Sequence, residues 1–483
     1  MGHNNTDIVV IGSGITGMAA AITAAEGGAK VIMFEKQRSL GGSSNFFEGT
    51  FAVESELQRQ KYIFYTKDQA FKNIMDYSHW KANPYVVRAI VDESGESISW
   101  LMNQGVEIVE ATINMPYCPM CYHHVKGYGA AAIKILAMKA KELGVDIRLG
   151  TPVTGLLKDG NKVAGIIYED NGEEVEVAAK AVLIGTGGYA NNKEWIKKYA
   201  GYELDKDVIT VGNTDKMGDG IRMAWEVGAA PAGLGILEMF AAGPVGPDFD
   251  MMNGIELVAI NPNLWVNNKG IRFCDEALTF FDSPLGNANA MYPYTWRLFD
   301  DTLIAYYEKH GVDKGMGFHG LPGTKPANFE KEFNAALARE STEVCMGNSI
   351  EELAVKMEVD PAVLKETFEE YNRFCAQGHD EMFAKDPRFL KPLVGPKYYA
   401  VRTRTLFLGT MGGIKINGKM EVLDKKDNVI GGLYAGGFDA AGMYGDSYCI
   451  ESTSGLSSSF ALNSGRIAGK NALKYLGIYK VSL

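Results

Sequence analysis

The glycine-rich segment near the start of the chain constrains its fold more than any other feature. Gly12, Gly14 and Gly17 form a G-x-G-x-x-G pattern within Gly12-Ser13-Gly14-Ile15-Thr16-Gly17. The β-branched run at 7–11 predicts a buried strand before it, and the alanine-rich run at 15–25 predicts a helix after it. The run at 30–34 predicts a second strand. The sequence therefore predicts a βαβ unit of a dinucleotide-binding domain, and hence an α/β fold.

Each residue of this unit has a physical reason to be there. Gly12 permits the tight turn, Gly14 lets the backbone approach a pyrophosphate, and Gly17 lets the helix pack closely on the strand. The unpaired N–H groups at the start of the helix favour phosphate binding. Glu35 lies 18 residues after Gly17, where an acid binds ribose hydroxyls and disfavours a 2′-phosphate.

The dinucleotide is predicted to be FAD rather than NAD. Three further glycine-rich segments are spread along the whole chain, namely Gly41-Gly42-Ser43-Ser44, Gly185-Thr186-Gly187-Gly188 and Gly432-Leu433-Tyr434-Ala435-Gly436-Gly437. A long cofactor buried through the domain explains several close backbone approaches better than NAD bound at one edge does.

Composition limits the partners and the number of domains. The 483 residues exceed what one compact core usually supports, so two domains are expected. The net charge of -11, without a basic stripe, argues against nucleic acid and anionic membranes as partners. The polar residues 1–5 lead straight into a strand without an apolar leader. We therefore expect a cytoplasmic protein.

Six cysteines in a chain of 483 residues are too sparse for a disulfide framework, which fits a reducing compartment. Cys118-Pro-Met-Cys121 is followed by His123 and His124, but no second ligand pair with zinc spacing follows. A structural or incidental role is expected for this motif, and no metal site is predicted.

Periodicity predicts the remaining elements. Helices are expected at 68–77, 84–103, 130–143, 350–357, 361–375 and 456–476. Strands are expected at 146–149, 153–158, 163–169, 173–178, 181–184 and 432–435, with a hairpin turn at Asp-Gly-Asn. Residues 40–66 show no clear periodicity and are expected to form a loop. The region 236–407 is richer in proline, aromatic residues and amphipathic helices, which indicates a separate domain.

Together these segments resemble the flavoprotein subunits of fumarate reductase and succinate dehydrogenase, to which the 3-ketosteroid dehydrogenases are related. The resemblance runs the length of the chain, in the four glycine-rich segments and in Glu35-Lys36, Gly-Thr-Gly-Gly-Tyr-Ala-Asn-Asn at 185–192, Met217-Gly218-Asp219-Gly220-Ile221, Trp265–Phe273, Thr410–Gly413 and Gly465–Gly469. It implies a Rossmann-type FAD-binding domain, at 1–235 and 408–483, with an inserted α+β capping domain at 236–407.

The resemblance also implies the FAD contacts. Ser43 and Ser44 would lie near the pyrophosphate and the flavin ring, Val153 would flank the adenine, and Asp439 would bind the ribityl chain. Ser457 and Ser458, at the start of the last helix, would face the flavin O2 edge, where a helix N-terminus stabilises the anionic reduced ring. The full set of expected cofactor-binding residues is Gly12, Gly14, Gly17, Glu35, Lys36, Gly42, Ser43, Ser44, Val153, Gly187, Asp219, Gly436, Asp439, Ser457 and Ser458.

The chain departs from the family pattern where the substrate would bind. Membrane-bound members attach FAD through a histidine at the position of Ser44, so non-covalent FAD is expected here. Gly409 stands where fumarate reductases carry a histidine, and Phe280 and Ser452 stand where they carry two arginines. A bidentate clamp for a dicarboxylate is therefore missing, which argues against fumarate or succinate as substrate.

Another residue must then deliver the proton that accompanies hydride transfer. Tyr448, Tyr444 and Glu451, in the loop before the last helix, are candidates, as is His123. Met239, Phe240, Phe280, Phe281 and Tyr444 suggest an aromatic-lined pocket, although a core role for several is equally consistent. A flat, uncharged enone, flavonoid or steroid-like ketone would suit such a pocket. The tetrahydrodaidzein reductases are similar to this chain in size and class.

The electron donor stays open at the level of sequence, because the chain has a single nucleotide fingerprint and no CxxCH haem motif. NAD(P)H, reduced flavin or a partner redox protein would serve, as expected for an enzyme of anaerobic metabolism. An oligomer is compatible with the sequence. Reduction of an activated double bond is the first hypothesis. An acceptor-dependent dehydrogenase and a non-catalytic flavin-binding subunit are the alternatives.

Overall fold

The computed structural model describes residues 5–115, 118–212, 214–246, 249–250, 253–315 and 320–478, so the start of the chain at 1–4 lies outside it. The chain divides into two compact units. Unit 1 comprises Met1–Gly201, Thr210–Glu238 and Leu408–Leu483, and unit 2 comprises Tyr202–Ile209 and Met239–Phe407. The sequence places the first boundary three residues earlier, at 235/236, and assigns the short segment 202–209 to the other part.

Unit 1 is built on an eight-stranded sheet with the order β18-β19-β8-β9-β1-β2-β6, in which β7 also pairs with β8. Its centre is parallel: β1 (Asn5–Ile11) pairs with β2 (Val31–Glu35) and with β9 (Glu173–Ile184), and β2 pairs with β6 (Asp146–Leu149). On the other side β9 pairs in parallel with β19 (Val429–Ala435). The central strands read as continuous apolar runs because both of their faces are buried.

One expectation for this sheet is wrong. The runs at 173–178 and 181–184 form a single strand, β9, rather than two strands. Its first half pairs antiparallel with β8 (Lys162–Asp170), which itself forms the predicted hairpin with β7 (Val153–Asp159). Its second half pairs parallel with β1. The change from alternating to continuous apolar sequence marks this change of partner and not a break in the strand.

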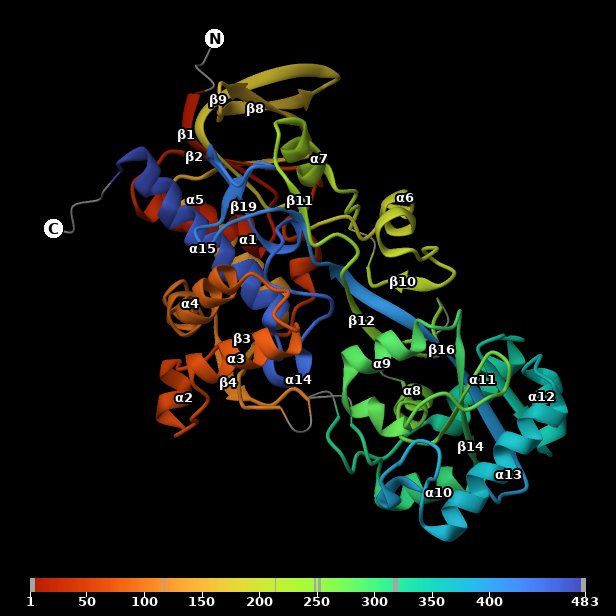
Figure 1. Cartoon of the computed structure of the whole chain (residues 1–483). Helices are drawn as coiled ribbons and strands as arrows, with labels where there is room; N and C mark the ends of the chain where they lie inside the picture. The colour runs from red at the N-terminus through yellow and green to blue at the C-terminus, as the bar shows by residue number, and fades with distance from the viewer. Residues whose placement is uncertain are drawn as a thin grey trace. The chain divides into compact units, whose positions relative to one another are not determined.

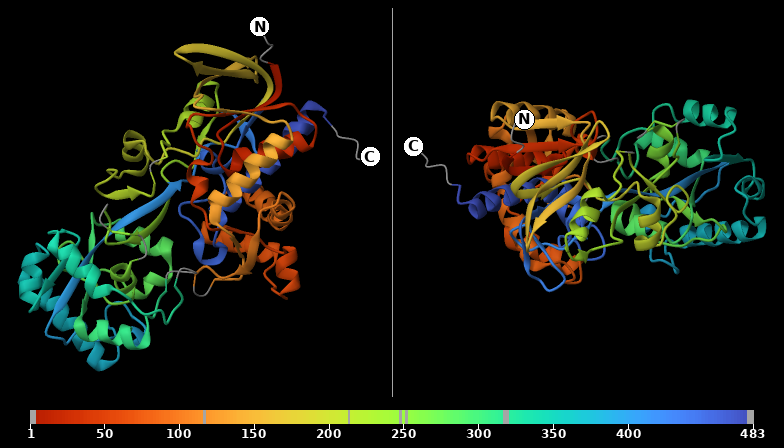
Figure 2. Two further views of the ribbon diagram at one scale, coloured as in Figure 1. Left: turned by 180° about the vertical axis from the view of Figure 1, so that it is seen from behind. Right: turned by 90° about the horizontal axis from the view of Figure 1, so that it is seen from above.

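Helix α1 (Ile15–Glu26) follows β1 and packs against the last helix, α15 (Leu456–Leu476). The contact is close because Gly465 has no side chain: a Cβ there would overlap the carbonyl oxygen of Thr16. The first (red) and last (blue) parts of the chain therefore lie side by side in unit 1, as Figures 1 and 2 show. The helices α5 (Tyr128–Glu142) and α4 (Pro84–Asn103) pack against α1 and α15 respectively.

The segment 40–66 is not a plain loop. It contains the 3₁₀ turn η1 (Gly42–Asn45), strand β3 (Gly49–Phe51) and helix α2 (Glu56–Gln60). Strand β3 pairs with β5 (Tyr122–Val125), which pairs with β4 (Ile108–Thr112), so three short strands form a separate sheet. A three-residue strand is too short to show the alternation on which the prediction rests. The other elements of unit 1 are α3 (Lys67–Tyr77), α6 (Lys193–Trp195), η2 (Ile196–Ala200), α7 (Asp219–Glu226), β11 (Pro231–Ala232), β17 (Gly413–Ile414), β18 (Glu421–Leu423), η6 (Gly437–Asp439) and α14 (Ile450–Thr453).

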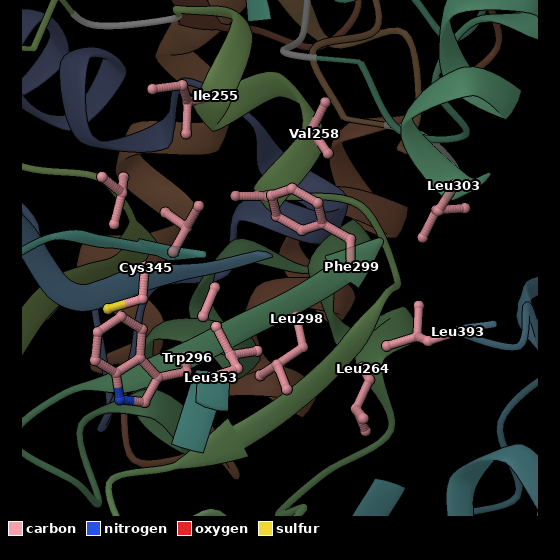
Figure 3. Packing of buried hydrophobic residues seen from close by; sticks show 14 of the residues in the cluster. Ile255, Val258, Leu264, Trp296, Leu298, Phe299, Leu303, Cys345, Leu353 and Leu393 are labelled. Atoms are coloured by element: carbon pink, nitrogen blue, oxygen red, sulfur yellow. The ribbon is translucent and has the colours of Figure 1, made fainter. Parts of the chain in front are cut away.

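Unit 2 is a six-stranded sheet with helices, in which β10 (Val208–Thr210), β16 (Tyr398–Thr410), β14 (Thr295–Asp300) and β13 (Leu264–Asn267) follow one another. β12 (Leu237–Ala242) and β15 (Val344–Gly347) also pair with β16. Figure 3 shows its core, where Leu298 and Phe299 of β14 lie among Val258, Leu303 and Leu353 from the surrounding helices. The helices and 3₁₀ turns of this unit are α8 (Gly254–Ala259), η3 (Glu276–Phe280), α9 (Asp282–Asn289), α10 (Asp301–His310), α11 (Phe329–Ala338), α12 (Ile350–Lys356), α13 (Pro361–Gln377) and η5 (Pro387–Phe389). In the part of the chain that the structure describes, no helix combines the length and apolar character needed to cross a membrane.

Candidate active site

A cavity of about 490 Å³ runs through unit 1, and the separate glycine-rich segments meet in its wall. It joins the carboxyl ends of the parallel strands, where ligands of open α/β sheets bind. Of the residues that sequence assigns to the cofactor, the cavity is lined by Gly12, Gly14, Glu35, Lys36, Gly42, Ser43, Ser44, Val153, Gly187, Asp219, Gly436, Ser457 and Ser458. Gly17 and Asp439 lie behind this lining.

At one end of the cavity the strand–turn–helix of β1 and α1 presents backbone to the interior. Gly12 has φ 99°, a left-handed conformation that favours glycine. Gly14 is the N-cap of α1 and has no side chain, and the hydroxyl of Ser44 accepts from the N–H of Ile15, the first residue of the helix, in its place. Gly17 lies behind the cavity lining and lets α1 pack closely on the turn, because a Cβ there would overlap the carbonyl oxygen of Gly12. This is the geometry that accepts a pyrophosphate.

Glu35 fixes the backbone at the same end of the cavity. Its carboxylate accepts hydrogen bonds from the N–H of Ser13 at 2.9 Å, from the hydroxyl of Ser13 at 2.6 Å and from the N–H of Gln37 at 2.8 Å. Lys36 next to it forms ion pairs with Asp219 at 2.8 Å and with Asp215 at 3.0 Å. Since a carboxylate accepts more than one hydrogen bond per oxygen, Glu35 can also bind ribose hydroxyls.

The carboxylate of Asp439 holds the glycine-rich turn at 185–188 in place. It accepts hydrogen bonds from the N–H groups of Gly187 at 3.0 Å, Gly188 at 2.9 Å and Thr186, and from the Thr186 hydroxyl. The side chain is fully buried, and burial raises its pKa in spite of these hydrogen bonds. Asp439 therefore shapes the turn that lines the cavity. A direct contact with the ribityl chain stays a prediction.

The other end of the cavity contains two charged groups that the sequence interpretation missed, Lys216 and Glu238. Both are only 3% exposed. Burial lowers the pKa of Lys216 to about 8, although the charge of Glu238 opposes the shift. Burial raises the pKa of Glu238 to about 7, opposed by a hydrogen bond with Ser457 and by the charge of Lys216. The start of α15, with Ser457 and Ser458, completes this end.

The expected proton donors lie close to this end but outside the cavity lining. The Tyr448 hydroxyl oxygen accepts a hydrogen bond of 3.4 Å from the N–H of Ser457, and burial raises the pKa of Tyr448 well above its usual value. The Tyr444 ring stacks edge-on against Tyr448 with centroids 5.9 Å apart. Glu451 lies beside Tyr77, whose pKa is raised by burial and, to a smaller extent, by the charge of Glu451. Their catalytic roles stay predictions.

His123 is placed differently. It is fully buried in β5, with Nε2 2.7 Å from the Ser55 hydroxyl and Nδ1 3.2 Å from the carbonyl oxygen of Cys121. Burial lowers its pKa to about 4, so the ring is neutral at physiological pH. Both ring nitrogens are engaged, which favours a structural role. Met239, Phe240, Phe280 and Phe281, which the sequence suggested as the lining of an aromatic pocket, belong to unit 2 and do not line this cavity.

The residues present fit FAD. The cavity offers a phosphate-binding helix start and an acid at one end, glycine turns in its middle, and a second helix start with ionisable groups at the other. Among the described residues, no cluster of three or more metal-binding side chains is found.

Comparison with known families decides the identity. Residues 7–454 match the family model described as "FAD binding domain". The chain belongs to this family. A relative in Lactiplantibacillus plantarum, named vinyl phenol reductase, is 34% identical over 483 residues, covering 98% of this chain and 97% of that protein. The flavoprotein is thus an FAD-dependent oxidoreductase.

Solved structures agree with this assignment. The flavoprotein matches the open conformation of a flavocytochrome c3 fumarate reductase with a TM-score of 0.74 and 26% identity, over 98% of this chain and 78% of that chain. It also matches a 3-ketosteroid Δ1-dehydrogenase from Sterolibacterium denitrificans with a TM-score of 0.79. That match covers 98% of this chain and all of that chain, at 20% identity, and shows the shared fold. The flavoprotein is a fumarate reductase-like member of its family, as its motifs imply.

Little in the sequence indicated that Lys216 and Glu238 belong to the site. Lys216 precedes Met217-Gly218-Asp219, in a segment that reads as an exposed loop, and Glu238 interrupts an otherwise apolar strand. A charged residue inside an apolar run was the one available hint for Glu238. Their burial depends on segments far away in the chain, which sequence alone does not place.

Proposed function

We propose that the flavoprotein reduces a carbon–carbon double bond conjugated to an aromatic ring or a carbonyl group, in a small uncharged substrate, and that it does not reduce fumarate. One observation carries this proposal. At Gly409 a Cβ would overlap the ring of Phe438, which itself lines the cavity. A histidine cannot stand at that position unless Phe438 moves, so an apolar ring occupies the space of a polar substrate ligand.

The other substrate positions support the same conclusion. Phe280 packs against Phe389 with ring centroids 5.3 Å apart. Ser452 has its hydroxyl 2.9 Å from the thiol of Cys449, and its carbonyl oxygen accepts a hydrogen bond from Tyr65. Neither side chain can form a bidentate pair with a carboxylate, as arginine does. A dicarboxylate would lose the charge-assisted bonds that bind it.

The name of the relative in L. plantarum indicates the kind of substrate. A vinyl phenol is flat and aromatic and carries no carboxylate, so it has the properties that these substitutions favour. Because that relative is 34% identical over nearly the full length of both chains, a vinyl-substituted phenol is the first compound to test.

When bound, FAD supplies a hydride from N5. The chain must then provide a proton at the neighbouring carbon. Tyr448 is our first candidate because its hydroxyl lies at the start of α15, next to the cavity-lining Ser457. Its raised pKa keeps it protonated at neutral pH. Tyr444 and Glu451, which do not line the cavity, are the alternatives. The Tyr444 ring packs edge-on against Tyr448, and Glu451 lies beside Tyr77.

We further propose that FAD is held non-covalently. Ser44 lines the cavity, and its hydroxyl accepts a hydrogen bond of 2.9 Å from the N–H of Ile15, so it caps α1. A serine hydroxyl in this role offers no histidine-type attachment to the ring. Acid precipitation should release all of the yellow colour into the supernatant.

The test is anaerobic reoxidation of the photoreduced flavoprotein. We expect 4-vinylphenol or an aromatic enone to restore the oxidised flavin absorbance within seconds, and fumarate to leave it reduced for at least ~100 times longer. Fumarate turnover at a comparable rate would refute the proposal. Adding NADH, NADPH or reduced FMN in place of light would then identify the donor. Oxidation of a saturated substrate with a dye acceptor would instead support a dehydrogenase.

A further inference from the structure

Lys216 and Glu238 are held in place by segments from four parts of the chain. The N–H of Lys216 donates to the Asn191 side chain at 2.9 Å, and its carbonyl oxygen accepts from the N–H of Asn191 at 3.0 Å. Its ammonium donates to the carbonyl oxygen of Leu408 at 3.1 Å. Glu238 lies on β12, two residues after Ile236, whose carbonyl oxygen accepts from the N–H of Met411 at 2.9 Å. The Lys216 ammonium is therefore held by a backbone carbonyl, and the Glu238 carboxylate by its hydrogen bond with the Ser457 side chain.

Each of the two groups has hydrogen-bonding capacity left for a ligand. A lysine ammonium has three N–H groups, and the bond to Leu408 uses one of them. Oε2 of Glu238 has no hydrogen-bond partner among the described residues, although it is buried in the wall of the cavity. The charged atoms of the two residues, both described, do not come within the 4.0 Å of an ion pair. A buried carboxylate oxygen without a partner is costly, so a ligand group is expected to bind Oε2.

The order of the polar groups along this end identifies the ligand edge. The start of α15 offers backbone N–H donors, Glu238 next to Ser457 accepts, and Lys216 donates again. The pyrimidine edge of an isoalloxazine ring presents the complementary series, with the C2 carbonyl as acceptor, N3–H as donor and the C4 carbonyl as acceptor. Adenine and ribose do not present this series.

We propose that Glu238 accepts a hydrogen bond from flavin N3–H, that Lys216 donates to the C4 carbonyl oxygen, and that the two residues together set the reduction potential of the bound FAD. The ammonium stabilises the negative charge that the ring gains on reduction, whereas the carboxylate opposes it. When the ring takes up two electrons from the donor, it also takes up one proton and is left with one negative charge, and the Glu238 carboxylate takes up one further proton from solvent. The premise is FAD binding, and the inference holds whichever substrate the enzyme reduces.

Among the residues that the structure describes, few groups face Lys216 and Glu238. Glu238 is surrounded by Lys216, Ser457, Tyr448 and Tyr444, and both tyrosines stay neutral because burial raises their pKa. Lys216 faces Glu238 and the carbonyl oxygen of Leu408. The pKa values of about 7 for Glu238 and about 8 for Lys216 support the exchange of a proton near neutral pH.

The test is an anaerobic dye-equilibrium titration of the holoenzyme between pH 6 and 9, without substrate. The variants are Lys216→Met and Glu238→Gln. The controls are Lys126→Met and Glu107→Gln, from an ion pair of 2.9 Å whose side chains are both 63% exposed. We expect Lys216→Met to lower the potential and Glu238→Gln to raise it, with the controls unchanged. Above pH 7 the wild type should bind one more proton per two electrons than Glu238→Gln does. Equal potentials, or shifts of the same sign, would overturn the proposal.

A second measurement uses the unaltered chain, in case a variant does not fold. Apoprotein is reconstituted with FAD or with FAD methylated at N3, and the dissociation constants are compared. Loss of a hydrogen bond to a charged acceptor should weaken binding roughly ten- to hundredfold. Equal affinity for both flavins would refute the contact with Glu238. Since no substrate is present, neither result depends on the proposed reaction.

Discussion

Asp439 accepts a hydrogen bond of 2.9 Å from the backbone N–H of Gly188, and the same carboxylate binds the N–H groups of Thr186 and Gly187. One buried side chain thus fixes a turn that lines the cavity. An asparagine in its place would turn an NH₂ group toward backbone N–H donors. We expect Asp439→Asn to destabilise the protein by about 2–4 kcal/mol and to weaken FAD binding. Urea unfolding with flavin fluorescence measures both. A variant with wild-type stability would contradict this role.

The packing of α1 on its strand predicts the effect of a single methyl group. A Cβ at Gly17 would overlap the carbonyl oxygen of Gly12, and backbone cannot move aside as a side chain can. We expect Gly17→Ala to cost more than about 2 kcal/mol of stability and to lower FAD affinity at least tenfold. Gly155→Ala is the matched control, because its nearest atom, in Ile167, lies 3.5 Å away at ordinary contact distance. If the two variants behave alike, close packing is not the reason for Gly17.

The sequence was sufficient to predict an element and its ends wherever neighbouring residues carry a strong capping or glycine signal. Helices α4 and α15 begin and end at the predicted residues, because Asn83 caps α4 ahead of Pro84 and Gly477 ends α15. The nucleotide end of the cavity was predictable for the same reason, since its residues lie within one βαβ unit.

Non-local features were not predictable. The continuity of β9 depends on a change of partner from β8 to β1, and the latter is about 170 residues away in the sequence. The burial of Lys216 depends on the carbonyl oxygen of Leu408, which comes from a different part of the chain. A lysine and a glutamate read as solvent-exposed until these contacts are known, because charged residues are rarely fully buried.

Gly409 and Phe438 should behave as a coupled pair. Alanine at 409 would collide with the Phe438 ring, so we expect Gly409→Ala to cost about 1–3 kcal/mol. In a Phe438→Ala background the same change should cost nothing measurable, which gives a coupling energy of similar size in a double-mutant cycle. Additive effects of the two substitutions would show that the ring yields easily. The proposed exclusion of polar groups at this position would then fail.

The buried carboxyl group of Glu238 predicts how the stability of the apoprotein depends on pH. Its pKa of about 7 in the folded state lies above the 4.5 of an unburied glutamate. Between these values the unfolded chain releases a proton that the folded chain retains, so stability falls as pH rises from 4.5 to 7 and stays low above it. We expect the wild type to lose roughly 3 kcal/mol more between pH 5 and 8 than Glu238→Gln does. Parallel pH profiles from urea unfolding would show that Glu238 is ionised in both states.

The cysteines should be inert in the folded protein, because the thiolate is the reactive form. Burial raises the pKa of Cys121, Cys274, Cys345 and Cys449, to about 11 for Cys345 and Cys449, and Cys118 is buried as well. Cys375 is partly exposed, although burial raises its pKa too. At pH 7.5 we expect a thiol reagent to label Cys375 slowly and the other five at least ~100 times more slowly. In urea all six should react at one rate. Rapid labelling of Cys118 or Cys121 in the native protein would instead indicate a redox-active CxxC pair.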